Sequence, residues 1–88
     1  MRIRHTGSNS EITDEGTGSL RFGGNNVVIG SATFGVTMAT FAQGGAAKLY
    51  HNDVKRLETT NTGVDITDNL KVVGVSTFTG NVYIADSI

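Results

Sequence analysis

Short segments in which apolar and polar residues alternate, separated by glycine-containing turns, constrain the fold of this chain more than any other feature. The apolar positions in these segments are Ile3, Ile12, Leu20, Phe22, Val64, Ile66, Leu70, Val72, Val82 and Ile84. Alternation with a period of two is typical of a β-strand that buries one face. The chain also has 12 glycines, which readily adopt the positive φ that tight turns require. The sequence therefore predicts an all-β fold of short strands joined by Gly and Asn turns.

Composition supports this prediction. Val, Ile and Thr together make up 27 of the 88 residues, and β-branched side chains are enriched in strands. One window departs from the pattern, because Phe34, Met38, Phe41 and Ala42 follow the helical spacing i, i+4, i+7, i+8. Threonines interrupt this window and no clear N-cap precedes it. We therefore predict a strand there.

A hairpin is predicted within the segment AAKLYHNDVKRLETTNTGVDIT, where two alternating stretches flank a polar turn. A three-residue loop at 52–54 would place Leu49 directly across from Leu57 and put both on one face. A two-residue loop at 52–53 would instead set Leu49 against Arg56 and lose the apolar pair. The apolar pairing favours the three-residue loop.

A chain of this size has little material for a core of its own. With 88 residues it is one domain at most, and a lone domain of this size buries only about 60 to 65% of the surface of its unfolded chain. It has no cysteine, which excludes disulfides, and its hydrophobic content is 38%. A metal or partner chains remain as support. We expect copies of the chain to complete one shared core, formed by Leu49, Leu57, Val64, Ile66, Leu70, Val72, Phe78, Val82 and Ile84.

Charge and hydropathy exclude two classes of partner. Seven Lys and Arg stand against eight Asp and Glu, giving a net charge of -1, so no basic surface for nucleic acid or an anionic membrane is predicted. No apolar run approaches the ~18 residues of a membrane span. The N-terminal MRIRHTGSNSE has no apolar signal-peptide core. We predict no nucleic-acid partner and no membrane insertion.

No residue pattern predicts catalysis, a cofactor or a metal. His5 and His51 are far apart without cysteine, unlike the ligand spacing of zinc sites. Asp14 and Asp68 lie in acidic pairs without EF-hand spacing and are interpreted as turn acids. G-x-S-x-G and phosphate-loop motifs are missing, and a chain without Trp offers little aromatic surface for a glycosidase cleft. The chain is predicted not to be an enzyme.

Three blocks carry a family resemblance: IRHTGSNSEITDEGTGSLRF at 3–22, GGAAKLYHNDVKRLETTNTGVDIT at 44–67 and VGVSTFTGNVYIADSI at 73–88. With these the chain resembles modules of tail-fibre-like structural proteins from tailed phages, particularly phages of marine bacteria. The resemblance implies a β-rich module of a virion fibre, made in the host cytoplasm and assembled as an interleaved homotrimer. Residues 1–88 would then be one module of a longer, repetitive fibre chain. Val54 departs from the family pattern, because the last loop position often needs positive φ, which a β-branched residue disfavours.

Two other functions remain open. The chain could be a fibre-tip module that binds a host-surface glycan through exposed polar and aromatic residues, for which the candidates are Tyr50, His51, Asn52 and Tyr83. Alternatively, it could form a β-solenoid or an open filament in which copies stack head to tail. A solenoid would show a fixed repeat, whereas the Thr-Phe pairs at 33–34, 40–41 and 77–78 recur at different spacings.

Overall fold

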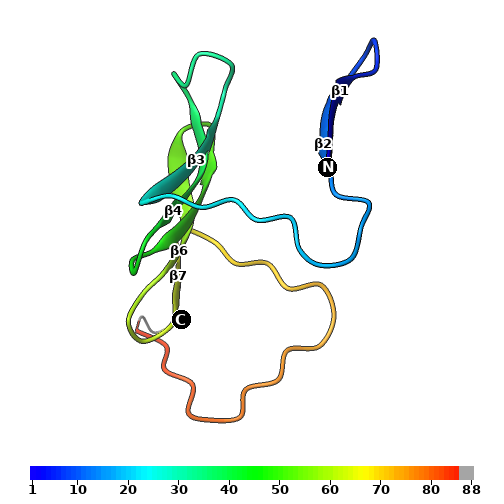
Figure 1. Ribbon diagram of the computed structural model, residues 1–88. Helices are drawn as coiled ribbons and strands as arrows, with labels where there is room; N and C mark the ends of the chain where they lie inside the picture. Colours follow the sequence, from blue (N-terminus) through cyan, green and yellow to red (C-terminus); the bar gives the residue numbers. More distant parts are fainter. Residues whose placement is uncertain (86–88) are drawn as a thin grey trace.

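The computed structural model describes residues 1–85 and is built from strands, turns and extended segments (Figure 1). Its strands are β1 (Arg2–His5), β2 (Ser10–Thr13), β3 (Asn26–Gly30), β4 (Thr37–Ala42), β5 (Ala47–His51), β6 (Val54–Thr59) and β7 (Val64–Ile66). Residues 1–85 form no helix, so the all-β prediction is confirmed. The window with helical spacing contributes β4, as predicted. None of the described residues provides a helix that could cross a membrane.

Strands β1 and β2 form a separate antiparallel hairpin. Ile3 pairs with Ile12, and a turn closed by the Thr6 amide and the Asn9 carbonyl oxygen, 2.7 Å apart, joins the strands. This hairpin contacts no strand of the larger sheet, and Figure 1 shows it standing apart in blue. The alternation around Ile3 and Ile12 therefore correctly predicts two strands, but they pair only with each other.

The other five strands form one antiparallel meander in the order β3-β4-β5-β6-β7. Every strand pair in residues 1–85 is antiparallel, which differs from the stacked parallel strands of a β-helix. One row of directly paired residues crosses the whole sheet, formed by Ile29, Ala39, Leu49, Leu57 and Ile66. The predicted pairing of Leu49 with Leu57 is confirmed within this row.

The turn that joins β5 and β6 differs from the prediction. His51 pairs with Val54, so the loop has two residues, Asn52 and Asp53, and the predicted three-residue loop is wrong. Both loop residues have positive φ, 51° and 65°, the conformation that matches the twist of a hairpin. Val54 lies in β6 and needs no positive φ. The Asp53 side chain also accepts a hydrogen bond of 2.9 Å from the Thr37 amide, which ties this turn to β4.

A β-bulge restores the apolar pairing after this shorter loop. Tyr50 pairs with Lys55, but the next residue of β5, Leu49, pairs with Leu57, leaving Arg56 as an extra residue in β6. A bulge of this kind places two residues of one strand opposite one residue of its neighbour. The two-residue turn and the Leu49–Leu57 pair therefore coexist.

Three predicted strands do not form in this structure. Residues 20–22, 70–72 and 82–84 have no ladder partner and are not strands. A strand requires a neighbour for its backbone N–H and C=O groups, and no described strand pairs with these segments. Figure 1 shows the chain after β7 running as a wide, extended loop, yellow to red. Five predicted core residues in it are exposed: Leu70, Val72, Phe78, Val82 and Ile84.

The described chain has almost no interior. Its radius of gyration is 18.1 Å, whereas a compact domain of this length would have about 12 Å. Ala39, 8% exposed, is the one buried hydrophobic residue in the described chain. Most large apolar side chains are exposed, which indicates that this protein has an oligomeric partner.

Candidate assembly surface

The five-stranded sheet has one face that is mostly apolar. Directly paired residues of antiparallel strands point to the same side, and residues two apart in a strand share that side. Nine apolar residues on one side form the "apolar face": Val27, Ile29, Ala39, Phe41, Ala47, Leu49, Leu57, Val64 and Ile66. By the same rule, three polar residues lie on this side at the ends of their strands: Thr37, His51 and Thr59. Ala39 is covered by its larger neighbours, but Ile29 and Leu49 are each 48% exposed. Nothing in residues 1–85 forms a second layer over this face.

The opposite face of the sheet carries charge. Glu58 Oε1 accepts a hydrogen bond of 2.6 Å from Lys55 Nζ, and Glu58 Oε2 lies 3.7 Å from Lys48 Nζ. The hydrogen bond to Glu58 raises the pKa of Lys55, and the same hydrogen bond lowers the pKa of the Glu58 carboxyl. Asp65 lies on this face across from Glu58. The charged side chains of this face are well hydrated in water. Assembly through the sheet would therefore bury the apolar face instead.

The two edge strands differ in how well they are protected from pairing with another chain. β7 has three residues with the charged Asp65 at its centre. β3 has five residues, Asn26–Gly30, and three consecutive apolar ones among them. A groove at this edge is lined by Phe22, Val27, Val28, Ile29 and Phe41. Short length, charge and proline are the usual protections of an edge strand, and β3 has none of them.

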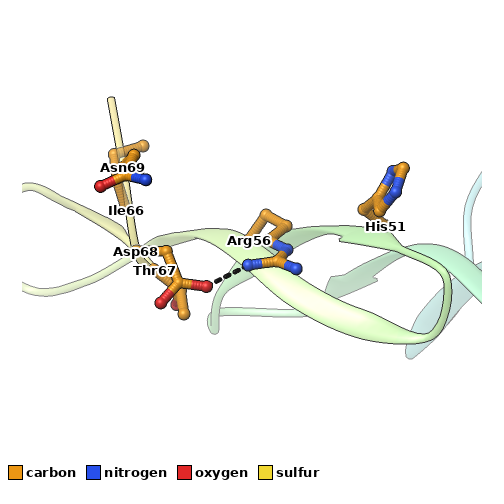
Figure 2. Close-up of a pocket in the computed structure, with 6 residues that line it drawn as sticks. All are labelled: His51, Arg56, Ile66, Thr67, Asp68 and Asn69. Atoms are coloured by element: carbon orange, nitrogen blue, oxygen red, sulfur yellow. Dashed lines mark hydrogen bonds and ion pairs between the residues drawn. The ribbon is translucent and has the colours of Figure 1, made fainter. Parts of the chain in front are cut away.

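A polar pocket lies at the other end of the sheet's strand order, where the chain leaves β7. Its lining residues are His51, Arg56, Ile66, Thr67, Asp68 and Asn69 (Figure 2). Figure 2 shows the guanidinium of Arg56, the bulge residue, donating a hydrogen bond to the Asp68 carboxylate, with His51 away from this ion pair. The Thr67 amide donates a hydrogen bond of 2.9 Å to the Arg56 carbonyl oxygen. Arg56 thus contacts the departing chain twice, through its side chain at Asp68 and through its carbonyl oxygen at Thr67.

The two predicted turn acids behave differently. Asp14 Oδ1 accepts a hydrogen bond of 3.1 Å from the Gly16 amide, as expected of a turn acid. The Asp68 carboxylate pairs with Arg56 instead, and Asp68 has a φ of 72°. That left-handed conformation turns the chain away from β7. In residues 1–85 no three His, Cys, Asp or Glu side chains gather where a metal ion could be held.

The predicted recognition residues lie in two regions. Tyr50, His51 and Asn52 are consecutive at the end of β5 and its turn, and Tyr50 and His51 point to opposite faces because they are adjacent in a strand. Tyr83 lies in the strand-free part after β7 and is 88% exposed. The last three residues of the third family block, 86–88, lie outside the described residues.

Sequence reasoning missed two features of this surface. The run Val27, Val28, Ile29 does not alternate, so alternation alone does not predict a strand there. Its composition could have predicted one, since a short β-branched run bounded by Gly24 and Gly30 is also consistent with a strand. Nothing in the sequence predicts the role of Arg56, because a bulge interrupts alternation and has no sequence motif of its own.

The chain was compared with known proteins at three levels. Comparison with protein-family models, with curated protein sequences and with solved structures finds no match.

Proposed function

We propose that this chain is a structural segment of a phage-type tail fibre, in which three copies form an elongated, rigid shaft as part of the virion. The observation that carries the proposal is the uncovered apolar face of the five-stranded sheet, in a chain whose one buried hydrophobic residue among 1–85 is Ala39. A protein that works alone rarely leaves such a face in water. A fibre segment would bury it against other copies.

Assembly supplies what the single chain lacks. Apolar area removed from water contributes roughly 25 cal/mol per Å², and a partner that binds only the folded chain stabilises it by mass action. The extended dimensions, 54 × 34 × 30 Å, suit a segment of a long object better than a globular domain. The resemblance of three sequence blocks to phage tail-fibre modules supports the same function.

The mass of the purified chain in solution tests this proposal. Light scattering after size exclusion, at two concentrations about tenfold apart, should give three chains at both. Circular dichroism should show strands that melt more readily on dilution, because folding and assembly are coupled. A single chain with full strand content at both concentrations would contradict the proposal. Material that grows to filaments would favour the open arrangement instead of a closed trimer.

The polar pocket favours a second candidate, a module that binds a host-surface glycan. His51, Arg56, Asp68 and Asn69 offer donors and acceptors beside the exposed β5–β6 turn, and polar side chains of these types can hydrogen-bond sugar hydroxyls. A glycan array should then give signals that Asn69→Ala lowers and Asp14→Ala, at a distant turn, leaves unchanged. An array without signal removes this candidate.

A further inference from the structure

We propose that the free outer edge of β3 binds residues 69–73 of a second copy as a sixth strand. The inference rests on the proposed self-assembly and names the contact through which it occurs. It follows from three observations: an unprotected edge, a segment with strand character but no partner, and a distance that one chain cannot span.

The backbone of β3 is arranged to accept a strand. The Gln43 amide donates to the Asn25 carbonyl oxygen over 2.8 Å, which fixes the hydrogen-bonding pattern between β3 and β4. Because paired and unpaired positions alternate along an antiparallel strand, the N–H and C=O groups of Asn26 and Val28 point outward. No strand of the described residues lies beyond β3 in the sheet. These outward donors and acceptors therefore have no neighbouring strand to hydrogen-bond with.

Residues 69–73 have the pattern of the missing strand. Their sequence, Asn-Leu-Lys-Val-Val, has the five-residue length of β3. Leu70 and Val72 are 70% and 51% exposed, although they alternate with a lysine as in a strand with one buried face. This segment has no ladder partner within the described part of the chain.

The two elements cannot meet within one chain. Neighbouring strands lie about 4.8 Å apart, so a position beyond β3 is five spacings, about 24 Å, from β7. The three residues from Ile66 to Asn69 span at most about 11 Å when fully extended. Asp68, in its left-handed conformation and paired with Arg56, also turns the chain away from the sheet. The strand that binds β3 must come from another copy.

The chemistry of the two faces agrees with this pairing. With Leu70 and Val72 on the apolar face, both extend the surface formed by Val27 and Ile29 and reach the groove at that edge. Lys71 then lies on the opposite face beside Val28, where the side chain can stay in water. Each copy would use one edge and give one segment, so the contact is heterologous. Such contacts close into a ring, here of three copies, or continue as a filament.

Two complementary variants test the contact in the full-length chain. Val28→Pro removes an outward N–H and blocks the edge, at a position where an edge strand tolerates proline. Leu70→Asp with Val72→Asp disables the donated segment. Each variant alone should lose assembly, whereas their mixture should give a complex of two chains, because one intact edge meets one intact segment. Two controls should assemble like the unmodified chain. Val28→Thr is the control for the edge variant, and the double variant Ser76→Asp, Thr79→Asp is the control for the segment variant.

The outcomes separate the two proposals. If the unmodified chain assembles and either blocked variant assembles equally well, or if the mixture stays at single-chain mass, the β3 contact is wrong while self-assembly stands. If the unmodified chain is a single chain at every concentration, the proposed function fails and the contact fails with it. Val28→Lys serves as a second edge variant, and its circular dichroism checks that the blocked edge has not unfolded the sheet.

Discussion

Strand β7 of the five-stranded sheet and the segment after it, residues 67–85, carry the same alternation of apolar and polar residues but form different structures. In the sheet, short connections such as 43–46, 52–53 and 60–63 return each strand to its neighbour. After Thr67 no such connection follows, and the chain leaves the sheet (Figure 1). Alternation therefore decides which face a strand would bury, but a short turn or a second chain decides whether the strand forms.

The apolar face offers the largest effect. Leu49→Ala should lower the free energy of unfolding of the assembled protein by about 2 to 5 kcal/mol per chain, as for a buried leucine. Urea denaturation at two protein concentrations measures the change. Lys48→Ala, on the charged face of the same strand, should cost less than about 1 kcal/mol. Equal effects of the two substitutions would show that assembly does not bury the apolar face. The proposed difference between the sheet and residues 67–85 would then be wrong.

The β5–β6 turn tests the importance of short connections. Asn52 has a φ of 51°, and an ordinary L-residue in the left-handed region costs about 1 to 2 kcal/mol. Asn52→Ala should therefore lower the free energy of unfolding by that amount in thermal or urea melts. Asn52→Gly, which adopts positive φ freely, should change it by less than about 1 kcal/mol. If both substitutions behave alike, the backbone conformation of this turn does not determine the pairing of β5 with β6.

The ion pair at the point of departure should have a smaller effect. Arg56→Ala should destabilise the sheet by no more than about 1 kcal/mol, because both side chains are exposed. It should nevertheless speed hydrogen exchange of the Thr67 amide, whose acceptor is the Arg56 carbonyl oxygen. Asp68→Asn should have the same effect, and the double variant should add little. Unchanged exchange would show that the pair does not hold the chain at the sheet.

Acid should produce the smallest effect. The pKa of Glu58 is lowered from its ordinary value of 4.5, chiefly by the hydrogen bond from Lys55. A carboxyl with a lower pKa in the folded state contributes stability above its unfolded pKa, and that stability is lost as pH falls through the folded value. Melting temperature should therefore fall slightly as pH decreases below 4.5, and Glu58→Gln should flatten this dependence. Lys55, whose pKa is raised, loses its contribution only at alkaline pH above 10.5. A slope unchanged by Glu58→Gln would assign the acid effect to other carboxyls.

Several strands could be predicted from periodicity, because the side chains of a half-buried strand alternate every two residues. β1, β2, β7 and the pairing of Leu49 with Leu57 were accessible in this way. The two-residue turn was not, because the bulge at Arg56 compensates for it and leaves no periodic signal. Residues 70–72 and 82–84 have the right pattern, but pattern alone does not supply a neighbouring strand.

The candidate surface was accessible only in part. The structure places four residues of the predicted shared core, Leu49, Leu57, Val64 and Ile66, on one face of the sheet. The shared core that these residues are predicted to form with other copies stays a prediction. The edge of β3 could not be ranked from sequence, because a run of apolar residues does not reveal whether its strand lies at the centre or at the edge of a sheet.

The open edge of β3 also has a consequence for how the protein is made. In the proposed assembly, a newly synthesised chain exposes an unprotected strand until another copy binds it, and any β-rich chain could pair with that strand in the meantime. The time between synthesis and encounter then decides between correct assembly and aggregation. Chains released close together, from ribosomes on the same messenger, would meet soonest. We therefore expect the yield of correctly assembled protein to depend on the rate and crowding of its own translation as much as on its final stability.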